Sequence, residues 1–390
     1  MGIIPLKLLI ISHKEIWKSY NSKNIYETSG GFPLQIRAIS NLFSKTYLLC
    51  GLRNKYRLNY LTPLFGKNLN IFPIEEPPFS GYLRKISILF WLPINIKKIW
   101  SLIRYSNVVH ILIPGDIGLI GLILALIAKK PIFVRHCGTW GNNYTYTDKF
   151  IYWILPKIAN GKNIIMATGG GIEGPEKNNP NIKWIYSTSI SKMEWDSTPI
   201  KNIWEIGQEL KLISVGRLSK EKNTESTILA LVKLKEKIPR FHLDIIGDGE
   251  EMKRLKNITS SFSLDNKVTF HGNKSHQQIL DALCKSHLFL FPTNVKEGFP
   301  KVLIEAMACG LPAIATRISV IPYLIENDCG IILGDTSPDS IFEAIIKMIN
   351  NPKKMELMSE KARLISKDYT LENWQDLIGS TLRKQWGPLK

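Results

Sequence analysis

The second half of the chain alternates short apolar runs with longer amphipathic stretches. Runs such as 211–218 and 241–247 contain many β-branched residues and end in turns, which predicts strands. Residues 224–237 repeat apolar positions with helical spacing. In full, the pattern predicts strands at 211–218, 241–247, 267–272, 288–293, 312–317 and 330–333, and helices at 224–237, 250–260, 275–286 and 301–309. This alternation predicts an α/β fold with a parallel, doubly wound sheet.

The first half has the same alternation in a less regular form. Its pattern predicts strands at 6–12, 45–51, 107–113, 131–136 and 163–168, and helices at 33–44, 95–105, 117–129 and 148–159. A break at 196–209 begins with Thr198-Pro199, so we expect a hinge there. The predicted domains are therefore 1–197 and 205–370. A final helix in 371–390 is expected to pack back towards the N-terminal domain.

Composition supports two folded domains and directs attention to the first half. The chain has 390 residues, of which 44% are hydrophobic and 22% are charged, which is enough for two ordinary cores. The net charge is +18, and residues 1–200 hold 24 basic against 10 acidic residues. This excess predicts an anionic partner for the first half.

The cysteines and the apolar runs narrow the class of protein further. The five cysteines are odd in number and form no C-x-x-C pair, which argues against a disulfide framework or a zinc site. We therefore expect free thiols in a reducing cytosol, and we interpret the apolar N-terminus as a strand rather than a signal peptide. The longest apolar run, 117–128, is shorter than the roughly 20 residues that cross a bilayer.

Two turns could carry chemistry, since ligands of doubly wound sheets bind beyond the carboxyl ends of the strands. Arg217 and Lys222 lie between a predicted strand and a predicted helix, where two cations and helix N–H groups suit a diphosphate. Glu297 follows another strand and Glu305 lies in the next helix, so their carboxylates could accept hydrogen bonds from sugar hydroxyls. Taken singly, each pair is better explained by solvated or structural side chains.

Four segments in series make the resemblance to a known family specific. The chain resembles the retaining GT-B glycosyltransferases, in particular family four, the glycosyl transferases group 1, over roughly residues 210–335. The segments are GRLSKEKN (216–223), DIIGDGEE (244–251), FHG (270–272) and EGFPKVLIEAMACGLPAIAT (297–316). They include the Glu-x7-Glu pattern and the Arg and Lys five residues apart. The resemblance implies a GT-B fold, with two Rossmann-like domains facing a central cleft.

The resemblance also implies roles for these residues. Arg217 and Lys222 would neutralise the diphosphate that leaves a nucleotide-sugar, Glu297 would contact the transferred sugar, and Glu305 would bind the ribose. Further residues would line the donor site, namely Gly247, Lys274, Gly298, Phe299 and Pro300. The chain has no Asp-x-Asp sequence, so we expect no metal and no cofactor, with the two cations as the electrophiles.

The first half resembles the family more loosely. Gly30 and Gly31 precede a predicted helix and are similar to the family's glycine-rich loop, with Gly31 near the donor or acceptor. His136 ends a predicted strand and resembles the histidine that contacts the donor sugar; His110 and Asp116 stay open as alternatives. The region 184–196 departs from the family's usual turn before the hinge, so the contacts between domains do not follow from the resemblance.

A basic, aromatic segment accounts for part of the charge. Residues 79–106 contain no acidic residue, and Ile96, Ile99, Trp100 and Ile103 have helical spacing. A basic face beside Trp, Phe and Leu is typical of a helix that lies on anionic lipid, although a core helix with solvated lysines has the same pattern. Because many members of the family act on lipid-linked acceptors, we expect peripheral attachment to the inner face of the plasma membrane. No nucleic-acid motif is present.

The expected function is therefore sugar transfer. The resemblance implies a retaining, metal-independent hexosyltransferase that moves a sugar from a nucleotide-sugar to a cell-envelope glycan or lipid-linked acceptor, as in polysaccharide or lipopolysaccharide biosynthesis. The alternatives are a GT-B epimerase or phosphorylase, and a membrane scaffold without activity.

Overall fold

The structure is a computed structural model, and it describes residues 5–19, 25–53, 61–79, 81–141, 145–169, 174–177, 179–199, 204–325 and 328–390. Its contacts divide the chain into two compact units. The first unit takes Met1–Gly170, Gly174–Ile185 and Trp374–Lys390, and the second takes Tyr186–Asn373. The expected hinge falls partly at 200–203, outside the described residues.

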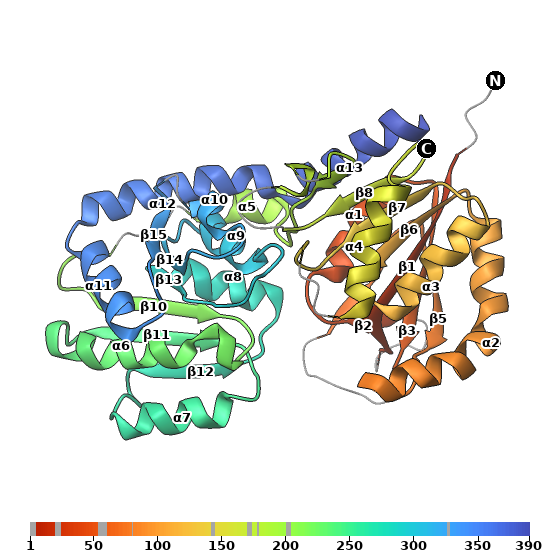
Figure 1. The fold of residues 1–390 in the computed structure, drawn as a ribbon. Coiled ribbons are helices and arrows are strands. Elements are labelled where there is room, and N and C mark those ends of the chain that lie inside the picture. Colours follow the sequence, from red (N-terminus) through yellow and green to blue (C-terminus); the bar gives the residue numbers. More distant parts are fainter. Residues whose placement is uncertain are drawn as a thin grey trace. The chain divides into compact units, whose positions relative to one another are not determined.

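The second unit has a parallel sheet with helices on both faces (Figure 1). The strand order is β12-β11-β10-β13-β14-β15, so the order reverses between β10 and β13. The strands are β10 (Leu210–Val215), β11 (Phe241–Ile246), β12 (Val268–Gly272), β13 (Leu288–Phe291), β14 (Ala313–Thr316) and β15 (Gly330–Leu333). All of these lie where the apolar runs predict them.

The helices of the second unit follow the predicted positions between residues 224 and 310, whereas the helix before them, at 192–197, is not predicted. They are α5 (Lys192–Ser197), α6 (Thr224–Lys237), α7 (Met252–Ser261), α8 (His276–Lys285), α9 (Lys301–Ala308), α10 (Ile321–Ile325), α11 (Pro338–Ile349) and α12 (Pro352–Ser366), with 3-10 turns at Lys220–Lys222 and Lys367–Tyr369. The pattern predicts no element for 338–366, where α11 packs on α6 and α12 packs on α9.

The first unit also has a mainly parallel sheet, which confirms the predicted α/β class with two doubly wound sheets. Its parallel strands are β1 (Lys7–Lys18), β3 (Lys45–Leu52), β5 (Leu69–Glu75), β6 (Val108–Ile113), β7 (Ile132–His136), β8 (Ile164–Ala167) and β9 (Ile182–Trp184). Here the order reverses between β1 and β6, which are paired in parallel. Two short strands, β2 (Tyr26–Thr28) and β4 (Thr62–Leu64), add an antiparallel extension to β1. β5 is not predicted, because Pro73 interrupts its apolar pattern. The structure accommodates this proline because β5 is an edge strand, paired with β3.

The helices of the first unit include one that differs clearly from its prediction. They are α1 (Phe32–Ser40), α2 (Gly81–Tyr105), α3 (Asp116–Ile127), α4 (Tyr146–Ile158) and α13 (Leu371–Trp386), with a 3-10 turn at Pro175–Lys177. α2 begins 14 residues before the predicted 95–105 and continues through Pro93. Pro93 cannot donate a hydrogen bond to the carbonyl of Leu89, and Leu89 lies on the exposed side of the helix.

α2 packs on the first unit through its second half. Ile99 and Ile103 are completely buried in the core cluster, and Ile96 and Trp100 pack against that cluster. The prediction that this stripe faces lipid is therefore wrong, because the stripe covers the sheet. Among the described residues, α2 is the helix whose length and mean hydropathy would suffice for a membrane crossing, judged by length and composition only.

The opposite face of the first sheet is covered in part by α13. Trp374 on this helix is completely buried, and the guanidinium of Arg135 on β7 lies 4.8 Å from the centre of its ring. The end of α13 is bound to the loop before β8, since Trp386 Nε1 donates a hydrogen bond to the Lys162 carbonyl at 2.7 Å. The C-terminal residues Trp374–Lys390 thus complete the core of the first unit.

Candidate functional site

Three of the candidate residues meet at the point where the strand order of the second unit reverses. Arg217 follows β10, Lys222 closes the 3-10 turn after it, and Glu297 lies in the loop after β13. Lys222 Nζ and a Glu297 carboxylate oxygen form an ion pair. This is the edge of a parallel sheet at which ligands bind, so the sequence prediction and the topology agree on its location.

Hydrogen bonds join the loop after β10 to the loop after β13. Asn223 Nδ2 donates to the Pro292 carbonyl at 2.7 Å, and the Asn294 N–H donates to the Glu221 carbonyl at 2.8 Å. Asn223 has a φ of 52°, a left-handed conformation that asparagine tolerates better than most residues. The loops therefore hold the cations and Glu297 in a fixed arrangement. The sequence offers Asn223 no functional signal beyond its position before α6.

The Lys222 ammonium group lies in a crowded, positively charged environment. Burial, followed by repulsion from the Arg217 guanidinium, lowers the pKa of Lys222 to about 8. The ammonium also lies 5.1 Å from the centre of the Phe291 ring. Arg217 itself is exposed. An anion with several oxygen atoms would relieve the repulsion between these two cations, which is what a diphosphate provides.

The N-terminus of α9 lies in the same loop. Pro300 occupies the N-cap position, and no side chain caps the first turn. The N–H groups of the first turn of α9 are therefore available to an anion. Phe299 is buried against Tyr186 and Tyr369, with ring centres 5.9 Å and 5.6 Å away. This packing fixes Gly298, Phe299 and Pro300 as the rigid entry to α9.

Glu305 lies inside α9 and is held by a group that the sequence did not single out. Its side chain is 9% exposed, and it accepts a hydrogen bond from Ser189 Oγ at 2.5 Å. His276 Nδ1 lies 3.3 Å from the same carboxylate, and His276 Nε2 lies 3.3 Å from Glu194 Oε1. An imidazole thus stands between two carboxylates at the start of α8.

The charges in this cluster stabilise one another. Burial by itself would lower the pKa of His276, but the ion pairs with Glu194 and Glu305 outweigh burial and raise that pKa to about 10. Burial would likewise raise the pKa of Glu305, yet His276 and Ser189 bring it below the ordinary value. His276 is therefore an imidazolium at neutral pH and orients the Glu305 carboxylate. Its only sequence signal is its place after Ser275, which caps α8.

Two further candidates from the sequence support this edge of the sheet. Gly247 has a φ of 138°, and a Cβ added there would lie 1.8 Å from the Gly216 carbonyl oxygen. Only glycine permits this approach, which sets the turn that precedes Arg217. Lys274 is half-buried and lies just before Ser275. The predicted donor contacts of Gly247 and Lys274 stay predictions.

The remaining two candidates belong to the first unit. His136 ends β7 and is buried, with Nδ1 3.1 Å from the Gly138 carbonyl and the ring edge-on to Trp140. Burial lowers the pKa of His136, so its imidazole is neutral at neutral pH. Gly31 is the N-cap of α1, which has no side-chain cap. The predicted contacts of His136 and Gly31 with a donor or acceptor stay predictions.

The two alternatives to His136 have different surroundings in the structure. His110 lies inside β6 rather than at its end, is completely buried, stacks on Phe133, and has a pKa lowered to about 3 by burial. His110 is therefore a core residue. Asp116 is the first residue of α3 and pairs with Arg84 Nε at 2.5 Å, so its charge is already compensated.

Comparisons with known proteins show similarity to glycosyltransferases over the second unit. Residues 196–365 match the family model for glycosyl transferases group 1. An uncharacterized glycosyltransferase of Haemophilus influenzae is 30% identical over 173 residues, 43% of this chain and 48% of that protein. A putative colanic acid biosynthesis glycosyltransferase, WcaL of Escherichia coli, is 35% identical over 124 residues, 30% of each chain. The matched segments thus span half the length of these relatives or less.

A solved structure extends the likeness to the fold of the first unit. The crystal structure of Anabaena Alr3699/HepE in complex with UDP and glucose has a TM-score of 0.68 and 16% identity. The match covers 97% of this chain and 99% of that protein. At this identity the likeness shows the fold, with two Rossmann-like domains. The family match is thus confined to residues 196–365, which resemble the glycosyl transferases group 1, and the likeness to the solved structure shows a two-domain GT-B fold for the chain.

Proposed function

We propose that this protein is a retaining, metal-independent glycosyltransferase that moves a sugar from a nucleotide-sugar to a cell-envelope glycan or a lipid-linked acceptor. The observation that carries the proposal is the arrangement of Lys222, Arg217 and Glu297 beside the uncapped N-terminus of α9. Two cations and open N–H groups suit a diphosphate, and a carboxylate beside them suits sugar hydroxyls.

Each group in this arrangement has a task in the transfer. As the bond between the anomeric carbon and the diphosphate oxygen breaks, negative charge develops on the diphosphate, and Lys222 and Arg217 stabilise it. Glu297, released from its ion pair with Lys222, accepts hydrogen bonds from the sugar. Glu305, oriented by His276, binds the ribose. His136 contributes a neutral imidazole from the first unit to the donor sugar.

A ligand-binding measurement tests the donor site. We expect UDP and UDP-sugars to raise the melting temperature of the purified protein, and we expect Lys222→Ala to remove that rise. Lys220→Ala is the matched control, because Lys220 is exposed in the same 3-10 turn. If no nucleotide in a broad panel stabilises the wild-type protein, or if both variants respond equally, the proposed donor site is wrong.

Product analysis tests the reaction itself. The similarity to a colanic acid biosynthesis enzyme supports an envelope glycan as acceptor, and an axial or equatorial anomeric proton in the product distinguishes retention from inversion by NMR. Activity that persists in EDTA supports the metal-independent reaction. Conversion of the nucleotide-sugar to its epimer without an acceptor would instead identify an epimerase.

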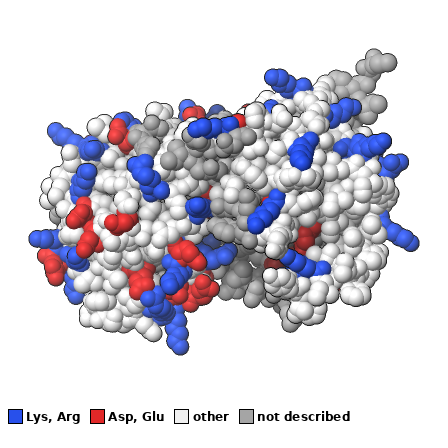
Figure 2. All heavy atoms as spheres, viewed as in Figure 1, with Lys and Arg blue, Asp and Glu red and all other residues white. Residues whose placement is uncertain are grey.

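We further propose a location for the protein from the surface of its first unit. On the face in Figure 2, Lys and Arg outnumber acidic groups over the first unit, whereas the second unit displays both signs. The first half of α2 exposes Leu83, Leu89, Phe90 and Ile94 to solvent. A basic surface with exposed apolar side chains favours peripheral attachment to an anionic membrane. Binding to anionic vesicles at low salt tests this, and absence of binding refutes it.

A further inference from the structure

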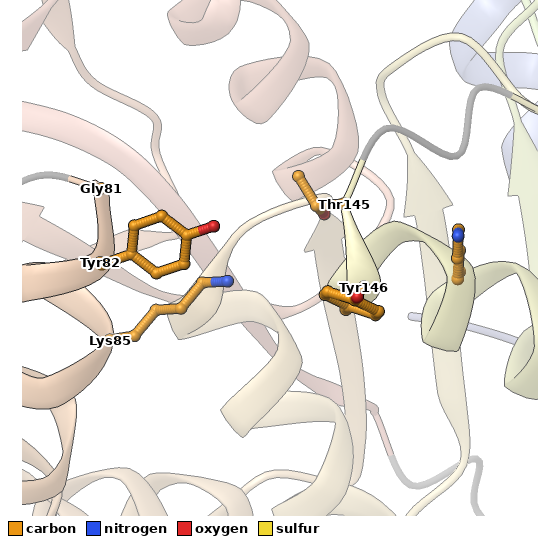
Figure 3. Close-up of a pocket in the computed structure, with 6 residues that line it drawn as sticks. Gly81, Tyr82, Lys85, Thr145 and Tyr146 are labelled. Carbon is orange, nitrogen blue, oxygen red and sulfur yellow. The ribbon is translucent and has the colours of Figure 1, made fainter.

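A cavity of about 460 Å³ lies between the first turns of α2 and α4 (Figure 3). Its volume is in the range of small-ligand sites. α2 follows β5 and α4 follows β7, so the cavity lies towards the carboxyl ends of the first sheet, where ligands of parallel sheets bind. The described residues that line it are Gly81, Tyr82, Lys85, Thr145, Tyr146 and Lys149.

The two helices present the same pair of side chains to this cavity. Each begins with a Tyr-x-x-Lys sequence, formed by Tyr82 and Lys85 on α2 and by Tyr146 and Lys149 on α4. The ammonium groups lie 5.4 Å and 5.6 Å from the centres of their own tyrosine rings. In Figure 3, Tyr82 and Lys85 extend across the cavity towards Thr145 and Tyr146. The lining therefore combines two ammonium groups with two phenol hydroxyls.

The acidic groups near the cavity are already engaged elsewhere. Asp116 pairs with Arg84, which precedes Lys85. Asp148 accepts hydrogen bonds from the Thr145 N–H at 3.0 Å and from Thr145 Oγ1 at 2.8 Å, as part of a capping box. Within the described parts of the chain, neither Lys85 nor Lys149 forms an ion pair. The cavity is therefore positively charged and suits a phosphate, because lysine and tyrosine side chains both donate hydrogen bonds to phosphate oxygens.

Apolar side chains lead away from the cavity along both helices. On α2 they repeat with helical spacing on the solvent side, opposite the buried Trp91, and on α4 they alternate with lysines. The exposed set is Leu83, Ile86, Leu89, Phe90, Ile94, Phe150 and Trp153. A soluble protein rarely exposes a continuous apolar surface of this kind unless it contacts another apolar phase. A phosphate site flanked by such a surface matches a lipid, which joins a phosphate to acyl chains.

We propose that the cavity binds the phosphate of an anionic membrane lipid and that the apolar stripe of α2 enters the acyl region beside it. The inference rests on the membrane attachment proposed above and adds a defined headgroup site to it. Lys85 and Lys149 hold the phosphate from opposite sides, and Tyr82 and Tyr146 lie at the level of the headgroups, where tyrosine is favoured.

Vesicle co-sedimentation tests this site with the full chain. The vesicles contain phosphatidylcholine alone or with phosphatidylglycerol, and the variant is Lys85→Gln with Lys149→Gln. We expect about 30-fold weaker binding to the anionic vesicles. The matched control is Lys97→Gln with Lys157→Gln, which removes the same charge from exposed positions further along the same two helices. We expect the control to bind within a few-fold of the wild type.

The outcomes distinguish a headgroup site from diffuse attraction and from a soluble phosphate ligand. Equal loss of binding in both double variants would indicate diffuse attraction and would overturn the proposal, as would failure of the wild-type protein to bind anionic vesicles. If glycerol phosphate stabilises the protein through Lys85 and Lys149 while vesicles do not bind, the ligand is a soluble phosphate and the lipid is refuted. Thermal stabilisation by UDP, measured in the same variants, reports the donor site independently.

Discussion

Removal of the His276 imidazole should destabilise the second unit substantially. In the wild-type protein this group lies 3.3 Å from Glu305 and 3.3 Å from Glu194. His276→Ala leaves the buried Glu305 carboxylate with Ser189 as its remaining contact in the cluster. Breaking a buried ion pair in this way costs about 3 kcal/mol, at the lower end because Glu194 is partly exposed. For a unit of this size, that corresponds to a fall in melting temperature of about 6–12 °C.

The stabilisation by His276 should depend on pH, in the direction set by the shift of its pKa on folding. Because folding raises the pKa of His276 from 6.5 to about 10, the imidazolium stabilises the folded protein fully below pH 6.5. That stabilisation declines as the pH rises above 6.5 and is lost as the pH passes about 10. The difference in unfolding free energy between the wild type and His276→Ala should therefore shrink as the pH rises.

Denaturation and NMR together test this prediction. Urea unfolding of the wild type, His276→Ala, Glu305→Gln and the double variant forms a cycle in which His276 and Glu305 should couple by about 2 kcal/mol. NMR should show the His276 ring still protonated at pH 8. A titration midpoint near 6.5, or a destabilisation below about 1 kcal/mol, would show that the cluster does not hold an imidazolium.

Three other predictions follow from particular contacts. Lys222→Ala or Glu297→Ala should abolish sugar transfer while the protein stays folded, as measured by product formation and circular dichroism; near-normal turnover in either would remove that residue from the mechanism. Gly247→Ala should destabilise the second unit by about 3 kcal/mol in chemical denaturation, since its Cβ would collide with a carbonyl oxygen; an unchanged midpoint would contradict the close approach. Trp374→Ala should cost about 3–5 kcal/mol in the first unit and expose the buried guanidinium of Arg135, whereas a shift confined to the second unit would contradict the assignment of α13.

The meeting of Arg217, Lys222 and Glu297 could be predicted largely from the sequence, because each of them follows a predicted strand of the parallel sheet. Arg217 and Lys222 lie in one strand-to-helix turn, and Glu297 lies in another, so a local pattern and the rule for parallel sheets predict their meeting. The cluster around Glu305 could not be predicted from the sequence pattern. Glu194, His276 and Glu305 come from three helices, and no local periodicity relates them.

The predictions for the first unit failed where a pattern was compatible with two surroundings. The spacing of Ile96, Ile99 and Ile103 shows an apolar face but not what covers it, and the sheet covers it here. His110 sits in an apolar strand that is equally consistent with a strand end or a strand interior. β5 was not predicted because Pro73 interrupts its sequence pattern. A proline is compatible with this strand because β5 lies at the edge of the sheet.

The α/β alternation, most strand and helix positions and the common turn of Arg217 and Lys222 could all be predicted from the sequence, because each depends on local periodicity or on a contiguous motif. The tertiary structure alone decided which apolar faces are buried, how His276 orients Glu305, that Trp374 and the C-terminal helix complete the first unit, and that two Tyr-x-x-Lys turns share one cavity. These features join residues far apart in the chain, and only packing determines which of the available partners meet.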